Sequence, residues 1–187
     1  LVLQAMETVA VPIFVFLLFE GFQHTSDWKK YLARLAGLAV LTEIPYDLAM
    51  NGKMLELGTQ NPVIGLVLCF VLLLLFRRFA GKKLICIAMA LAGFVWAIML
   101  KVDHGVPMML MICVMHLFRN KKMYMGFSGM AAAALCIGLS PFYLVAPMGF
   151  LAIHFYNGEK GNSSRLVNYL FYPVALLAMA LIAKFAF

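Results

Sequence analysis

The sequence predicts an all-α fold, a polytopic bundle of about eight transmembrane helices that forms one integral-membrane domain over residues 1–187. Hydrophobic residues make up 65% of the chain and the mean hydropathy is +0.95, whereas a soluble domain is about half apolar. The apolar residues gather in runs, and the basic residues fall in alternate gaps between these runs. Together these observations favour a bilayer environment.

The apolar runs are candidate helices, and most approach the roughly 20 residues needed to cross about 30 Å of hydrocarbon. In order, they cover residues 2–19, 31–50, 61–76, 84–100, 106–118, 123–139, 142–156 and 166–187, with short polar or turn-forming segments between them. The fifth run is the shortest and rises only about 20 Å. It must therefore thin the membrane, extend over 101–105 or lie inside the bundle.

The basic residues predict the orientation, because cytoplasmic loops retain Lys and Arg. Most of the 15 follow odd-numbered runs, so the first run would cross from outside to inside and the chain would end outside. No charged leader precedes the first run, which favours an additional helix before it. The residues after odd-numbered runs are Lys29, Lys30, Arg34, Arg77, Arg78, Lys82, Lys83, Arg119, Lys121, Lys122, Lys160 and Arg165; the exceptions are Lys53, Lys101 and Lys184.

Composition also argues against two kinds of site. The net charge of +7 is spread over short loops without interleaved aromatic residues, so attraction to anionic membrane lipid is a plainer account than nucleic-acid binding. The four cysteines lie inside apolar runs at spacings unlike those of zinc ligands. We therefore expect them to pack in the core, and we predict no metal site. Glycines on the helix faces could support self-association of the chain into an oligomer.

The second run contains the ionisable pair Glu43 and Asp47. Charged groups inside a membrane span are costly and are functional candidates by default. The two carboxylates lie four residues apart on one helical face, with Pro45 bending the helix between them. Two acids this close should not both ionise easily, so one could take up a proton near neutral pH. The alternative is a pair neutralised by Lys53 or Lys101.

Other candidates lie at the two ends of the helices. Arg34, at the cytoplasmic end of the second run, could meet a phosphorylated ligand or anchor the chain at the membrane surface. Glu20 and His24 close the first run four residues apart and could hold one imidazole tautomer or form a solvated cap. Asp103 and His104 are expected at the outer mouth, at the depth of the acidic pair, without predicted contact to it.

Three stretches of the first half carry a resemblance: PIFVFLLFEGFQHT at 12–25, KYLARL at 30–35 and TEIPYDL at 42–48. With two later stretches, at 103–119 and 156–173, they resemble the TraX family of bacterial membrane proteins, named for the enzyme that acetylates the N-terminus of conjugative pilin. The resemblance covers nearly the whole chain and implies a multi-helix acyltransferase of the bacterial plasma (inner) membrane that uses acetyl-CoA. The family pattern marks Glu20, Gly21, His24, Arg34, Glu43, Pro45, Asp47, Asp103 and Gly105.

The chain departs from the family pattern at two places. Members usually begin with an additional helix that carries an Asp-His-Gly-type motif, and this sequence starts after it. The family also tends to place a histidine two residues after the Tyr-Pro of the last helix, where this chain has Ala175. Alanine cannot transfer a proton, so the chain is a diverged member or an inactive variant, or that histidine is not essential.

The resemblance and the residues combine into one expected mechanism. The phosphates of acyl-CoA would dock at the cytoplasmic end, and an amine or hydroxyl acceptor, such as a pilin N-terminus, another peptide or a glycan, would enter from outside. The expected catalytic positions are Glu43, Asp47, Asp103, His24 and, by family position, Ala175; the expected acyl-CoA contacts are Arg34, Lys29, Lys30, Arg77, Arg78 and Tyr172. The alternatives are a proton-coupled small-molecule transporter and a non-catalytic membrane scaffold.

Overall fold

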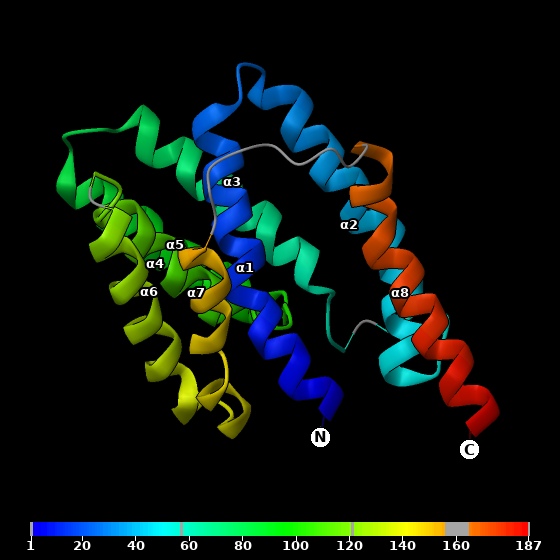
Figure 1. The fold of residues 1–187 in the computed structure, drawn as a ribbon. Helices are drawn as coiled ribbons and strands as arrows, with labels where there is room; N and C mark the ends of the chain where they lie inside the picture. The colour runs from blue at the N-terminus through cyan, green and yellow to red at the C-terminus, as the bar shows by residue number, and fades with distance from the viewer. Residues whose placement is uncertain (1, 57, 121, 156–164, 187) are drawn as a thin grey trace.

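The computed structural model describes residues 2–56, 58–120, 122–155 and 165–186, and within these ranges the fold is all-α (Figure 1). The predicted ends at residues 156 and 187, together with Lys121 and Lys160, lie outside the described residues. In chain order, the helices are α1 (Val2–His24), α2 (Trp28–Asn51), α3 (Pro62–Arg78), α4 (Lys83–Met99), α5 (Gly105–Leu117), α6 (Lys122–Leu135), the 3-10 helices η1 (Cys136–Gly138) and η2 (Pro141–Leu144), α7 (Pro147–His154) and α8 (Arg165–Ala186).

Local signals explain where the helices on the candidate site begin and end. Asp27 caps α2 by accepting a hydrogen bond from the Lys30 amide at 3.1 Å, and Asn61 caps α3 in the same way through the Val63 amide at 2.9 Å. Asp and Asn are preferred N-cap residues because their side-chain oxygens satisfy free amides of the first turn. At the other end of α2, Gly52 takes the left-handed conformation (φ 64°) that ends many helices.

The predicted helix over 142–156 is wrong as a single element. Residues Pro141–Leu144 form the 3-10 helix η2, and α7 starts only at Pro147. Proline fits the first turn of a helix but interrupts its interior, because it lacks an amide hydrogen. The preceding run also ends early as an α-helix and continues as η1. These short elements place Tyr143 next to the α4–α5 turn.

The short helix α5 lies inside the bundle, as the third option for the fifth run predicts. It packs against α1, α3, α4 and α6. Five of its side chains are at most 1% exposed, namely Met108, Met109, Met111, Ile112 and Met115. The cysteines also pack in or against this core: Cys69 and Cys136 are buried, and Cys86 and Cys113 are half-buried. Methionine suits such a centre because its flexible side chain fills irregular gaps.

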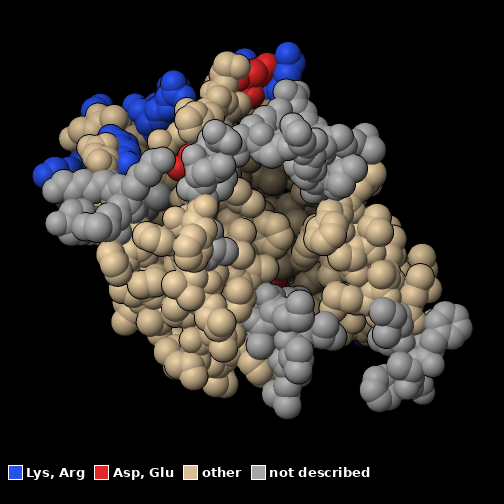
Figure 2. Space-filling model, in the orientation of Figure 1, with Lys and Arg blue, Asp and Glu red and all other residues tan. Residues whose placement is uncertain are grey.

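The basic side chains gather toward one end of the molecule on the face drawn in Figure 2. The α1–α2 and α3–α4 turns lie at this end, and the α2–α3 and α4–α5 connections lie away from it (Figure 1). The alternating charge of the sequence thus becomes a charge difference between the two ends of the bundle. Within the described part of the chain, no helix combines the length and the apolar character required of a candidate membrane span. The all-α class is confirmed, and the membrane crossings stay a prediction.

The helices α1 and α2 diverge from their connecting turn, and α8 packs along α2 (Figure 1). One ring contact reaches from α8 to α1: Tyr172 meets Phe14 edge to face, with centroids 6.0 Å apart. Figure 2 shows that this face is hollowed between the lobe of α1 and the lobe of α2 and α8. The divergence of α1 and α2 therefore leaves space between them.

Candidate active site

A cavity of about 720 Å³ runs between α1 and α2, with walls also from α3, α5 and α8. Its α1 wall is a single helical face whose lining residues recur every three or four positions. From Ala10 to His24 this face rises about 21 Å. Polar residues gather at the α1–α2 turn, apolar side chains line the middle, and His104 stands at the other end. The polar mouth consists of His24, Thr25, Ser26, Asp27, Tyr31 and Arg34.

A second cavity, of about 510 Å³, lies at the end of the bundle away from the basic turns. The outer part of α2, the α4–α5 turn and η2 line it. Its polar lining consists of Thr8, Tyr46, Asn51, Thr59, Asp103, His104, Ser140 and Tyr143. Both volumes lie in the range typical of small-molecule sites.

His104 is common to the linings of both cavities. Its imidazole Nδ1 forms a short hydrogen bond with the Tyr143 hydroxyl, and its Nε2 lies 3.8 Å from Oδ2 of Asp103. That carboxylate oxygen also accepts a hydrogen bond of 2.8 Å from the Tyr46 hydroxyl. Both tyrosines are almost fully buried. The four side chains therefore form one polar group, which α2, η2 and the α4–α5 turn bring together.

The backbone around His104 is held in an uncommon shape. His104 and Lys101 both have left-handed φ angles, 53° and 51°, which cost energy for residues other than glycine. Backbone hydrogen bonds fix this turn: Gln60 donates to Lys101 at 3.0 Å, and Asp103 donates to Gln60 at 2.9 Å. Next to the turn, a Cβ on Gly105 would lie 3.0 Å from that of Val102. The backbone hydrogen bonds before His104 and the close packing at Gly105 after it thus hold the imidazole in position.

Burial lowers the pKa of His104 below its ordinary value of 6.5, and the nearby Asp103 carboxylate offsets this in part. Desolvation disfavours the charged imidazolium. The ring is therefore mainly neutral at pH 7, in the form that can accept a proton.

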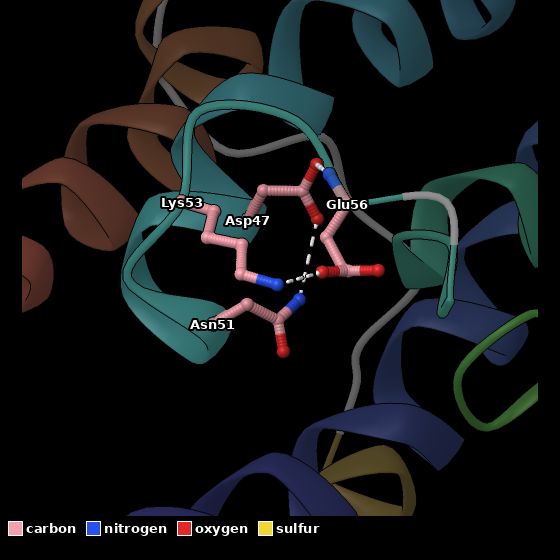
Figure 3. Close-up of polar contacts among 4 residues, drawn as sticks. All are labelled: Asp47, Asn51, Lys53 and Glu56. Carbon is pink, nitrogen blue, oxygen red and sulfur yellow. Dashed lines mark hydrogen bonds and ion pairs between the residues drawn. The ribbon is translucent and has the colours of Figure 1, made fainter.

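The acidic pair of α2 is held apart from both cavities. Asp47 is fully buried, accepts a hydrogen bond of 2.7 Å from the Glu56 amide, and contacts the Asn51 side-chain amide at 3.4 Å (Figure 3). Glu43 accepts a short hydrogen bond from the Asn61 side chain. Neither carboxylate is among the described residues that line a cavity. Each of the two acids thus binds a different point of the α2–α3 connection.

Lys53 does not neutralise the acidic pair. Its ammonium lies 2.6 Å from the Glu56 carboxylate (Figure 3). This hydrogen bond and the attraction of the opposite charges raise the pKa of Lys53 and lower that of Glu56. The ion pair is on the exposed surface of the α2–α3 connection.

Of the expected acyl-CoA contacts at the basic end, Arg34 lines the first cavity. Its Nε donates to the Lys30 carbonyl at 3.0 Å. The Lys30 ammonium pairs with Asp27 at 3.2 Å, and the Lys29 ammonium lies over the Trp28 ring, 5.7 Å from its centroid. Arg77 and Arg78 occupy the last turn of α3. These other four basic side chains are not among the described residues that line either cavity.

The remaining expected site residues lie at different depths. His24 is at the mouth of the first cavity, 79% exposed and 3.3 Å from Glu20. From Thr8, which lines the second cavity, α1 rises about 24 Å to His24, so this imidazole is far from His104. Tyr172 lines the middle of the first cavity. Ala175, one turn further along α8, is half-buried and is outside both described linings.

The sequence predicts a catalytic role for Asp103 but no role for His104, Tyr46 or Tyr143. A histidine between an acid and a glycine at the outer mouth was the available signal for His104. Tyr143 gave no such signal, because it lies in an apolar run 39 positions away. The packing of η2 against the α4–α5 turn brings it into the site.

Comparison with known proteins adds two findings. A family model described as TraX protein matches residues 2–183. The "Probable fimbrial assembly protein FimC, serogroup H1" of Dichelobacter nodosus is 27% identical over 196 residues, which cover 92% of this chain and 80% of that protein. No solved structure matches the chain.

Proposed function

Because the chain belongs to the TraX family, we propose that it is a bacterial membrane acyltransferase. It moves an acetyl or other acyl group from cytoplasmic acyl-CoA to an amine or hydroxyl acceptor. The single observation that carries the proposal is the position of His104, a half-buried histidine common to two cavities. A transferase for two substrates needs a base where the substrates meet. In this proposal the larger cavity takes the donor and the smaller one takes the acceptor.

The shape and charge of the larger cavity support the donor assignment. Its mouth lies at the α1–α2 turn, in the basic end of the molecule, and includes Arg34. A guanidinium binds phosphate oxygens through charge-assisted hydrogen bonds. The phosphates of acyl-CoA would stay at this mouth while the acyl end extends along α1 toward His104. Tyr172 would contact the extended arm halfway.

The lining of the smaller cavity supports a neutral or cationic acceptor. Its described residues include the carboxylate of Asp103 and several hydroxyl groups, without Lys or Arg. An ammonium group would be attracted there and an anionic acceptor would be repelled. The family resemblance and the printed name of the fimbrial relative favour the N-terminal amine of a pilin-type subunit.

His104 acts as the general base in the proposed step. Its Nδ1–H donates to Tyr143, which leaves the lone pair on Nε2. Nε2 removes the proton from the acceptor as the acceptor nitrogen or oxygen bonds to the thioester carbonyl carbon. Asp103 stabilises the imidazolium that forms, because its carboxylate lies 3.8 Å away. The carbon–sulfur bond then breaks and the leaving sulfur takes the proton from His104. The products are the acylated acceptor and free CoA thiol.

Exposed apolar side chains support placement in a membrane. The outer face of α4 presents a row of them, between 53% and 83% exposed: Leu84, Ile87, Leu91, Val95 and Ile98. Contiguous apolar surface of this kind is typical of contact with lipid or another protein. With the basic end facing the cytoplasm, the donor mouth would open inside and the acceptor cavity outside.

The direct test uses the purified protein in lipid nanodiscs, with acetyl-CoA and a peptide that has a free N-terminus. Equal amounts of CoA thiol and acetylated peptide are expected, measured by thiol titration and mass spectrometry. Neither product would form if the protein were a transporter or a scaffold. Solute flux in proteoliposomes, without thiol release, would identify a transporter.

Replacing Arg34 with alanine should raise the KM for acetyl-CoA roughly tenfold, at the lower end expected for lost hydrogen bonds to a charged group because this side chain is exposed. The value of kcat should stay near that of the parent. Arg119→Ala is the control, since it removes the same exposed charge from another described turn. Equal KM values in the parent and in Arg34→Ala would move the phosphate contact elsewhere.

The pH dependence of kcat/KM should report the neutral form of His104. Burial places its pKa below 6.5, and the neutral ring, present above that pKa, is the active base. The rate should therefore be level near pH 7 and fall about tenfold per unit once the pH drops below that pKa. Assays between pH 5 and 8 would measure it. A rate that rises as the medium becomes more acidic would contradict a neutral base.

A further inference from the structure

We propose that Asp47 is a positioning residue for His104, to which it is linked through the α2–α3 connection. This inference rests on the proposed function for its catalytic consequence. It reverses the role expected from the sequence, in which the Asp47 carboxylate itself removes the proton from the acceptor.

The contacts of Asp47 fit a structural anchor and not a base. Its side chain is fully buried, and its Oδ2 accepts the Glu56 amide hydrogen at 2.7 Å. A buried carboxylate is stable when donors satisfy its oxygens. The same carboxylate reaches Asn51 through Oδ1. Asp47 thus fastens the connection that leaves α2 back onto the last turns of that helix (Figure 3).

The anchored connection leads to the catalytic turn. Four positions after Glu56, the backbone of Gln60 forms two hydrogen bonds with the segment 101–103. Gln60 and Val102 form an isolated parallel bridge, and His104 lies two positions after Val102. Because His104 has a left-handed φ angle, the turn needs outside support to keep its shape. Asn51, the last residue of α2, and Thr59, within the connection, also line the acceptor cavity.

The exposed ion pair between Lys53 and Glu56 has a lesser part in this arrangement. It joins two side chains on the surface of the connection, where such pairs contribute little. The Glu56 amide hydrogen that binds Asp47 belongs to the backbone and remains when the Glu56 side chain is changed. Glu56→Ala is therefore a matched control that removes the ion pair and keeps the anchor.

The test compares the parent, Asp47→Ala, Asp47→Asn and Glu56→Ala in nanodiscs by two measurements. Hydrogen exchange of the segment 101–105 should quicken about tenfold in Asp47→Ala, since opening of this turn becomes easier. The kcat for acetyl transfer should fall roughly 10- to 100-fold, as for a displaced catalytic group, while the KM for acetyl-CoA changes less than about twofold because the donor mouth is remote. Asp47→Asn keeps an oxygen for the Glu56 amide and should recover most of the rate. Glu56→Ala should resemble the parent.

Unchanged exchange of 101–105 in Asp47→Ala would overturn the inference, and so would a kcat equal to that of an active parent. A rate in Asp47→Asn as low as in Asp47→Ala, with normal exchange of 101–105, would return the carboxylate to the role of base. A parent that transfers no acetyl group would overturn the proposed function instead. The exchange measurement would still decide whether Asp47 holds the turn.

Discussion

Replacing His104 with glutamine is expected to reduce kcat for acyl transfer by about 10²- to 10⁴-fold, the usual contribution of a general base. Glutamine keeps a polar side chain in the left-handed turn and can hydrogen-bond to Tyr143, but it cannot take up a proton near neutral pH. The KM for acetyl-CoA should change little, because the proposed phosphate site at Arg34 lies at the far end of the cavity. Steady-state assays of thiol release measure both constants.

His154→Gln is the matched control for this change. His154 lies at the exposed end of α7, so the same substitution there should leave kcat and KM near those of the parent. The fall of kcat/KM at low pH should also disappear in His104→Gln and persist in His154→Gln. A His104→Gln protein with full kcat would remove this imidazole from the reaction.

The sequence could predict the features that depend on short stretches of chain. Apart from the run over 142–156, each apolar run is helical over most of its length, because hydrophobic length and turn residues act locally. The basic turns gathered at one end, since successive helices alternate in direction. The failure over 142–156 was also local: Pro147 starts a new helix, and Ser140 accepts a hydrogen bond from the Phe142 amide that starts η2.

The partners of the acids could not be predicted in the same way. Glu43 and Asp47 share a helical face, and from that spacing alone a mutual interaction was reasonable. The α2–α3 connection folds back and gives each acid a separate amide partner. The pairing of His104 with Tyr143 likewise depends on how η2 packs. Such contacts join residues far apart in sequence, and a pattern of spacings does not include them.

The side chain of Asn61 makes several of these contacts between residues far apart in sequence. Asn61→Ala should lower the free energy of unfolding by about 2–4 kcal/mol. The side chain is fully buried, caps α3 through the Val63 amide and donates to the Ala39 carbonyl at 2.9 Å. Loss of an N-cap costs about 1 kcal/mol, and buried groups left without a partner add about 1–3 kcal/mol. The Glu43 carboxylate, which is half-buried, also loses the Asn61 side chain as a partner.

Thermal and denaturant unfolding in detergent would measure the effect of Asn61→Ala. Asp27→Ala is the control, because Asp27 also caps a helix, α2, but does so at the surface, and its loss should cost less. Asn61→Asp separates the cap from the other contacts: it keeps an acceptor for Val63 but places a second carboxylate against Glu43. If the contacts to α2 matter more than the cap, Asn61→Asp should be as unstable as Asn61→Ala. Stability equal to the parent's in Asn61→Asp would mean that capping of α3 is the main contribution of this residue.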